Sequence, residues 1–223
     1  MVALVVPVGH FAGPMYTSVD AEAPESFEVR FRDGVFSLSA EEYAVWAVSH
    51  GDPNKVSGDP EKKIAPKPPT RVQVEAAAKA AGVEEPGPIF DSLLDDGLLV
   101  SVMPTGASAR TFAEQHQVVP LALGLGNSPQ NPAEFQIGLP NAARVSVGYD
   151  VYHMWLFCHR QATLWEAIST IAKEAEEANA EDAASDSEQK VELVSNPDEL
   201  LKALLGALPV LISTSCVFID RRP

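Results

Sequence analysis

Hydrophobic and polar positions follow one order twice along the chain. The apolar triplet Val5-Val6-Pro7 returns as Val118-Val119-Pro120, and the alternating segment 27–31 returns as segment 135–139. A helical pattern then recurs at one constant spacing, in which Tyr43, Trp46, Ala47 and His50 correspond to Tyr152, Trp155, Leu156 and His159. A repeat of this kind predicts two copies of one structural unit in tandem.

Strands are predicted at the start of each unit. Residues 4–8 are an apolar run, and in segment 27–31 the residues Phe27, Val29 and Phe31 alternate with polar positions, as a half-buried strand does. Arg32-Asp33-Gly34 is a hairpin turn signal, and residues 35–38 form the returning strand. The second unit repeats the hairpin with segments 135–139 and 145–147. The glycine-containing segments 9–14 and 124–128 are interpreted as structural loops.

Three helices are predicted after each hairpin. Ser39 with Glu42, and Thr70 with Gln73, have the capping-box spacing that opens a helix. Gly82 ends the second helix, Gly87-Pro88 starts the third, and residues 98–102 are expected to form a strand that serves as the wing. In the second unit, helices are expected at 152–159, at 164–175 with an extension of a few turns, and from Asn196 onward. A closing strand is expected at 210–219.

These elements predict an α+β fold with two tandem repeats of a winged helix-turn-helix, each with an N-terminal β-hairpin or small antiparallel sheet. The first unit is expected to span residues 1–104 and the second residues 117–223. A connector at 105–116, with a short helical turn at 111–116, joins them. Insertions of loop composition occupy residues 51–69 and 179–190, and an acidic run covers residues 174–190.

The net charge of −15 over 223 residues disfavours nucleic acid and lipid surfaces as partners at long range. The third helix of the first unit carries Asp91 and Asp95 but no Lys or Arg, whereas a helix that reads a duplex presents cationic or amide side chains. A basic patch near the first insertion comprises Lys55, Lys62, Lys63, Lys67 and Arg71. This patch is interpreted either as a site for an acidic partner segment or a phosphate, or as a solvated loop of mixed charge.

Side chains with catalytic potential do not form a recognisable constellation. The spacings among His153, Cys158 and His159 are not those of a helical metal pair, and no metal or cofactor is predicted. Cys158 and Cys216 are expected to be buried free thiols. With no signal peptide and no apolar span, we expect a soluble cytoplasmic protein. An active site assembled between the two units would leave no trace in the sequence.

Residues 27–38 as a hairpin, followed by residues 39–100 as three helices, resemble the PqqD-like recognition domains of peptide-natural-product pathways. In that family a leader peptide adds as a strand to the sheet edge and packs against the third helix, which is β-augmentation. The resemblance implies a receiving strand with Val35, Phe36 and Leu38, and a groove lined by Ile89, Phe90 and Leu93. In the second unit it implies a strand with Val145 and Val147, beside Leu200, Leu201 and Leu204.

The sequence therefore favours a non-enzymatic adaptor that binds a protein or peptide, such as a precursor peptide or a regulatory partner. A winged-helix transcription regulator, docking through the basic patch or its wings, is the first alternative. A scaffold subunit of an enzyme complex is the second. A homodimer is compatible with each of these hypotheses.

Overall fold

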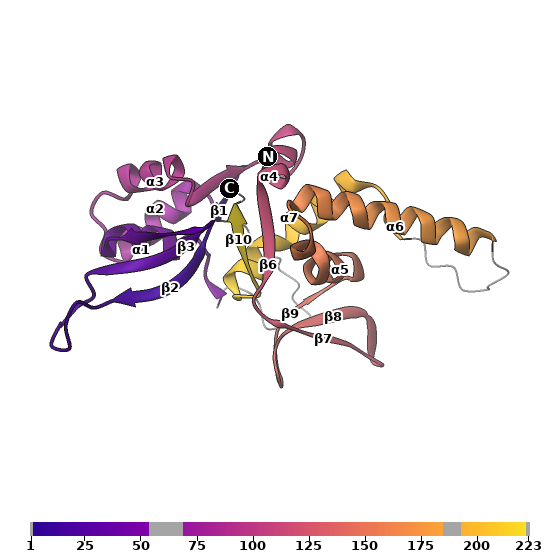
Figure 1. The fold of residues 1–223 in the computed structure, drawn as a ribbon, viewed down its shortest axis with the longest axis horizontal. Coiled ribbons are helices and arrows are strands. Elements are labelled where there is room, and N and C mark those ends of the chain that lie inside the picture. Colours follow the sequence, from indigo (N-terminus) through magenta and orange to yellow (C-terminus); the bar gives the residue numbers. More distant parts are fainter. Residues whose placement is uncertain (1, 54–68, 185–192, 222–223) are drawn as a thin grey trace.

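Strands and helices follow the same order in both halves of the chain (Figure 1). The computed structural model describes residues 2–53, 69–184 and 193–221, and its fold class is α+β, as predicted. The first half comprises β1 (Leu4–Pro7), β2 (His10–Met15), β3 (Ser26–Phe31), β4 (Gly34–Leu38), α1 (Ala40–Val48), α2 (Arg71–Ala80), α3 (Pro86–Asp95) and β5 (Leu99–Val102). After α4 (Ala107–Gln115), the second half comprises β6 (His116–Pro120), β7 (Leu123–Ser128), β8 (Asn131–Leu139), β9 (Ala142–Val147), α5 (Tyr149–Phe157), a 3₁₀ turn (Cys158–Arg160), α6 (Leu164–Ala184), α7 (Pro197–Ser213) and β10 (Val217–Arg221).

Each half contains a three-stranded and a two-stranded antiparallel sheet. The three-stranded sheets have the orders β2-β3-β4 and β7-β8-β9, so that the predicted hairpins β3–β4 and β8–β9 are confirmed. The segment expected as a wing, β5, pairs instead with β1, and β10 pairs in the same way with β6. The first and last strands of each half therefore close it as a unit.

The two glycine-containing segments interpreted as loops are strands β2 and β7, and that interpretation was wrong. Their glycines serve close packing: a Cβ on Gly9 would lie 2.6 Å from Val29 Cγ1, and one on Gly124 would overlap the Tyr152 hydroxyl. Both strands also carry a bulge, where Gly13 and Gly126 have φ of 122° and 75°. Glycine here allows close approach and a bulge within a strand.

Helix starts agree with the capping signals. The capping boxes Ser39–Glu42 and Thr70–Gln73 are both formed, and Asn196 caps α7 with Pro197 in its first turn. Helix α6 extends to Ala184, as the Ala/Glu composition allowed. The closing strand starts later than predicted, because residues up to Ser213 continue α7 through Pro209 and bury Leu208, Leu211 and Ile212.

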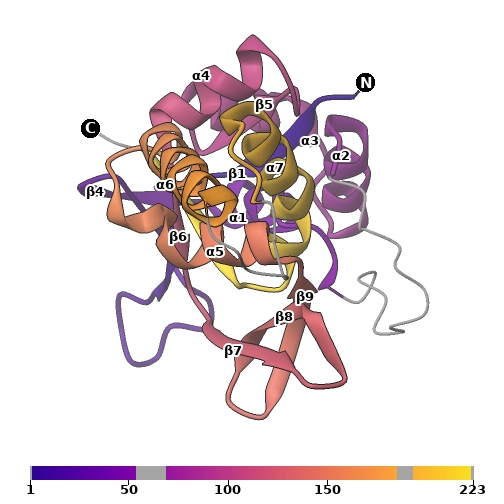
Figure 2. The same cartoon turned by 90° about the vertical axis from the view of Figure 1, so that its right-hand side faces the viewer.

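The connector contributes to the core. Helix α4 buries Ala109, Phe112 and Ala113, and it packs on α6 and α7, over which it lies in Figure 2. The Arg110 guanidinium lies over the Trp165 ring, 3.2 Å from its centroid. The connector therefore contains an integral helix, Ala107–Gln115, which is longer than the short helical turn expected at 111–116.

The halves meet along β1, β2 and β10. The Gly9 amide donates to the Ile219 carbonyl at 2.7 Å, and the Arg32 amide donates to Asp220 Oδ1 at 3.0 Å. Arg30 forms an ion pair with Asp220 at 3.1 Å. This junction holds β10 of the second half against the hairpin strands of the first half.

Candidate functional site

The outer edge of β4 is the least protected edge of the two three-stranded sheets. Strand β4 has the sequence Gly-Val-Phe-Ser-Leu. It pairs with β3 in a regular register and contains no proline, no charged residue and no bulge. The other outer strands of the two three-stranded sheets are protected: β2 has Pro14 and a bulge, and both β7 and β9 have register shifts. Such protection normally prevents another strand from pairing.

The hairpin register determines which backbone groups of β4 face outward. Phe31 and Gly34 flank a two-residue turn in which Arg32 has a φ of 55°, and the first and last residues of such a turn form a hydrogen-bonded pair. Bonded and non-bonded pairs alternate along an antiparallel ladder, so Phe36 bonds to β3, whereas the amides and carbonyls of Val35 and Ser37 point away from it. An added strand would pair with these two residues.

Side chains of β4 also divide by face. Val35 is 58% exposed, whereas Leu38 is buried and Phe36 is partly buried against the Phe31 ring, with centroids 5.6 Å apart. The Ser37 hydroxyl donates to Glu28 Oε2 at 3.2 Å. Of the three predicted contact residues, only Val35 therefore presents its side chain fully to a partner.

The matching edge in the second half is tied down. Arg144 stands where the first half has Val35, and its Nη1 donates to the carbonyls of Thr214 at 3.1 Å and Ser215 at 3.3 Å. The predicted contact residues Val145 and Val147 are both buried on the core side of β9. The β9 edge is thus less available than the β4 edge.

The expected groove along the third helix is not open to a partner. Phe90 and Leu93 are each 1% exposed and Ile89 is partly buried, while Leu200, Leu201 and Leu204 are buried in the second half. The groove was implied by the family resemblance, whereas the i, i+3, i+4 spacing of these residues forms the face by which α3 and α7 pack on their own units. The assignment of Phe90 and Leu93 as groove residues is corrected: they belong to the core.

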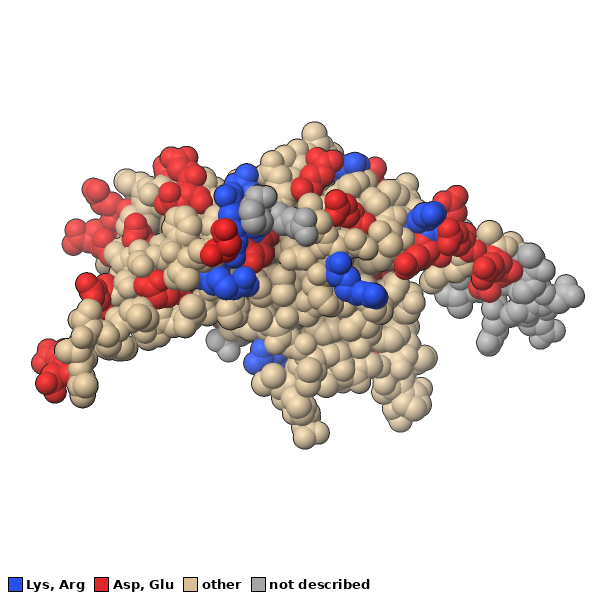
Figure 3. Space-filling view, in the orientation of Figure 1, with Lys and Arg blue, Asp and Glu red and all other residues tan. Residues whose placement is uncertain are grey.

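Acidic side chains cover the outer surface of α3. Asp91, Asp95 and Asp96 are exposed, and Figure 3 shows carboxylates gathered over this end of the molecule and along α6. Arg71 is bound to Asp91, with Nη1–Oδ1 and Nη2–Oδ2 distances of 2.6 and 2.9 Å. Its hydrogen bond to Arg71 lowers the pKa of Asp91. The other members of the basic patch, Lys55, Lys62, Lys63 and Lys67, lie outside the described residues, as does the end of the acidic run.

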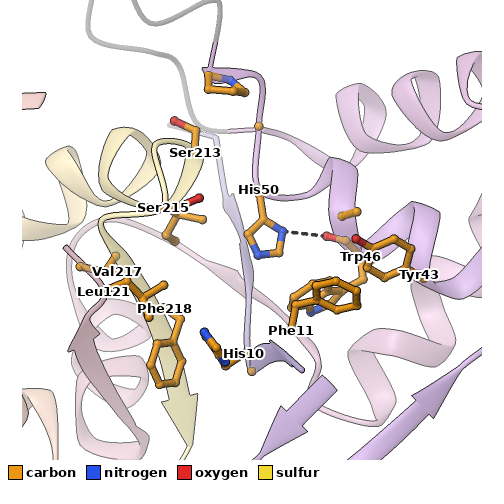
Figure 4. Close-up of a pocket in the computed structure, with 15 residues that line it drawn as sticks. His10, Phe11, Tyr43, Trp46, His50, Leu121, Ser213, Ser215, Val217 and Phe218 are labelled. Carbon is orange, nitrogen blue, oxygen red and sulfur yellow. Dashed lines mark hydrogen bonds between the residues drawn. The ribbon is translucent and has the colours of Figure 1, made fainter. Parts of the chain in front are cut away.

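A cavity of about 410 Å³ lies between the two halves (Figure 4). One wall is the face of α1 that carries Tyr43, Trp46 and Ala47, together with His50 just after the helix and the start of β2. The opposite wall comes from the end of α7, the turn after it and the start of β10. The other residues that line the cavity include His10, Phe11, Leu121, Ser213, Ser215 and Phe218.

Two histidines face this cavity. His50 Nδ1 lies 3.1 Å from the Trp46 carbonyl oxygen, and Figure 4 shows its second ring nitrogen turned toward His10 and Phe218. Burial lowers the pKa of His50 to about 4, so the ring is neutral at pH 7. Burial, together with the neighbouring Arg30, also lowers the pKa of His10. The cavity is therefore lined by aromatic rings and uncharged polar groups.

Ser215 occupies an unusual backbone conformation at the rim of the cavity. Its φ is 54°, in the left-handed region that favours glycine. Figure 4 shows its hydroxyl on the side of the cavity that faces His50. The sequence pattern placed Ser213 and Ser215 in a strand and so missed both the turn and the cavity.

The remaining candidate groups have structural environments. Cys158 and Cys216 are buried free thiols, as predicted, and burial raises the pKa of Cys158 to about 12. His153 stacks on Tyr149, with centroids 5.6 Å apart, and His159 is exposed. Across residues 2–53, 69–184 and 193–221, no group of three or more His, Cys, Asp or Glu side chains is placed to hold a metal ion.

The described helices include none with the length and apolar character needed to cross a bilayer. Comparison of the chain with protein-family models, with curated proteins and with solved structures found no match. The candidate sites therefore rest on the geometry alone.

Proposed function

We propose that this protein is a non-enzymatic adaptor that binds an extended segment of a partner protein as an added strand along β4. The observation that carries the proposal is the regular, exposed outer edge of β4, which lacks the protective features of the other outer strands of the two three-stranded sheets. Two outward-facing residues, Val35 and Ser37, supply backbone donors and acceptors to such a strand. The two halves are proposed to be copies of one PqqD-like or winged-helix unit, of which the first keeps the open edge.

The charge around β4 indicates the chemistry of the partner. Asp33 in the preceding turn and Glu41 at the start of α1 are both exposed, so that carboxylates stand at both ends of the strand. Arg30, across the sheet from Val35, has its charge offset by Asp220 at 3.1 Å. With a net charge of −15 on the chain, a basic segment is the partner that this edge favours.

Val35→Pro is the substitution that tests the edge. It removes an amide that points away from β3, so the ladder within the sheet keeps its bonds, and proline is tolerated on an outer strand. Val35→Ala is the matched control, because it removes the same exposed side chain but keeps the amide. Circular dichroism of both variants checks that the fold is retained.

The assay begins with affinity capture from native lysate and continues with synthetic peptides from the captured partner. We expect binding to be retained within about threefold by Val35→Ala and lost by Val35→Pro, because peptide addition depends on backbone bonds. Amide hydrogen exchange at Val35 and Ser37 should slow when the peptide binds. Equal binding by both variants, or unchanged exchange at these two amides, would refute binding at this edge.

The same preparation tests the alternatives. Tight binding to DNA fragments that weakens steeply between about 50 and 200 mM salt would favour the transcription-regulator hypothesis. The exposed carboxylates of α3 weigh against that outcome. Stable co-purification with an enzyme, unaffected by Val35→Pro, would favour a scaffold subunit.

A further inference from the structure

We propose that the cavity between the two halves is a binding site for a small, uncharged, planar aromatic molecule that carries one hydrogen-bond donor and one acceptor. The site lies apart from the β4 edge, and the inference does not depend on peptide binding. Its volume of about 410 Å³ is within the range of pockets that hold small organic ligands, roughly 300–1,000 Å³. Such pockets occur preferentially where two structural units meet, as here.

Aromatic rings determine the shape of the ligand. Phe11 and Tyr43 lie with ring centroids 4.8 Å apart, and Trp46 lies 6.2 Å beyond Tyr43 on the same wall. On the other side, the Phe218 ring packs against His10 with centroids 4.9 Å apart. A flat ring system placed between these walls gains stacking and edge contacts along with burial.

Polar groups determine its hydrogen bonding. His50 Nδ1 must donate to the Trp46 carbonyl, which only accepts, so the second nitrogen of the neutral ring is an acceptor facing the cavity. The Trp46 indole N–H is already used, because it donates to the Val8 carbonyl at 3.0 Å. On the opposite wall the Ser213 hydroxyl donates to the Val210 carbonyl at 3.2 Å, so the Ser215 hydroxyl is a donor available there. A ligand donor would bind at His50 and a ligand acceptor at Ser215.

A comparison of the two halves indicates why a serine stands at this position. The residue two positions before β5 is Gly97, with a φ of 78°, and the residue two positions before β10 is Ser215, with a φ of 54°. Both turns need a left-handed residue, and glycine adopts that conformation without the steric cost that a Cβ brings. The second half thus keeps a strained serine where the first half has glycine, and this strained residue lines the cavity. Strain of this kind concentrates at binding sites.

The probes are benzimidazole, which offers both a donor and an acceptor, indole, which offers only a donor, and benzoate, which is anionic. Titration of the full chain at pH 7.5, followed by amide chemical shifts in nuclear magnetic resonance spectra, measures each affinity. We expect benzimidazole to bind with a dissociation constant of about 1 mM or tighter. Indole should bind roughly fivefold more weakly and benzoate not detectably. Absence of benzimidazole binding, or equal binding of all three probes, would overturn the proposal.

Two variants locate the site. Ser215→Gly should raise the melting temperature while weakening benzimidazole roughly fivefold, because it relieves strain and removes the donor. Asn141→Gly is its control: Asn141 has a φ of 63° in the β8–β9 turn, outside the cavity, and its substitution should raise the melting temperature without changing affinity. A Ser215→Gly variant that binds benzimidazole like the wild type would overturn the assignment of the donor.

Ala47→Leu tests the volume of the cavity. The larger side chain projects from the α1 wall, where the second half carries Leu156 at the matching position, and it should weaken benzimidazole at least about tenfold by occupying the site. Ala76→Leu, on the exposed face of α2, is the matched control and should leave the affinity unchanged. Unaltered benzimidazole affinity in Ala47→Leu would place the ligand elsewhere and refute the proposal.

Discussion

His116, the C-cap of α4 and the first residue of β6, makes the stability of the fold depend on pH. The residue is 2% exposed, Nδ1 lies 2.9 Å from the Phe112 carbonyl oxygen, and Nε2 has no hydrogen-bond partner among the residues that the structure describes. Burial lowers the pKa of His116 to about 4, and the positive charges of Arg221 and Arg32 act in the same direction, whereas Asp220 opposes them. Protonation would therefore place a charge in a site that cannot solvate it.

The sign and size of the effect follow from the difference between the two states. An unfolded histidine titrates near pH 6.5, so the unfolded chain binds the proton first as the pH falls. The stabilising contribution is fully present above about pH 6.5 and is lost progressively as the pH falls toward 4. At about 1.36 kcal/mol per pKa unit, the total loss is on the order of 3 kcal/mol. About 2 kcal/mol of it should appear between pH 7 and pH 4.5.

His116→Phe should remove this part of the pH dependence. The phenyl ring can keep the stacking on Phe112, whose centroid lies 4.5 Å away, and the Phe112 carbonyl still accepts the backbone amide of residue 116. Urea unfolding of wild type and variant at pH 7 and pH 4.5 gives four free energies of unfolding. The wild type should lose about 2 kcal/mol more than the variant between the two pH values. Equal losses in the two proteins would refute the reasoning.

Two further predictions compare matched positions by urea unfolding. Gly124→Ala should destabilise by about 1–3 kcal/mol, because the new methyl group overlaps a packed tyrosine hydroxyl. Gly148→Ala should cost less, under about 1 kcal/mol, because no atom lies within 4 Å of the new methyl group and the remaining cost is that of a poorer N-cap for α5. Trp46→Phe should cost about 1 kcal/mol more stability than Trp155→Phe. The Val8 carbonyl, which accepts from the Trp46 indole, has no second donor in the described structure, whereas the Cys216 carbonyl accepts from both the Trp155 indole and the Leu121 amide. Equal costs for the two tryptophans would contradict this account.

Local signals predicted the parts of the fold that depend on neighbouring residues. The turn at Arg32-Asp33-Gly34 and the capping box at Ser39 were readable because each needs only a few adjacent side chains. Whether this turn and this capping box form does not depend on distant segments of the chain. The same holds for the burial of Trp46 and Trp155, which helical spacing indicated.

Features that depend on distant segments were not readable. Glycine in β2 and β7 looks like a loop signal until the Tyr152 hydroxyl is seen packed against Gly124. The pairing of β1 with β5 joins residues nearly a whole unit apart, and the cavity combines α1 with the turn after α7. The sequence did contain one signal for the cavity. Aligning the two halves places Ser215 at the position of Gly97, and a residue that breaks a local conformational preference is often found at a functional site.

The positions at which the halves differ carry more functional information than those they share. Shared residues such as Trp46 and Trp155 are buried, and packing accounts for their retention. By contrast, the first half has Val35 on its outer strand, and the edge of that strand is open. The second half has Arg144 at the matching position, and its side chain binds the turn at Thr214 and Ser215. Each half contains the alternative that the other lacks: the first has an unstrained glycine turn at Gly97, and the second has an edge strand held by Arg144. An open edge in the first half and a strained serine in the second are therefore the features that binding best explains.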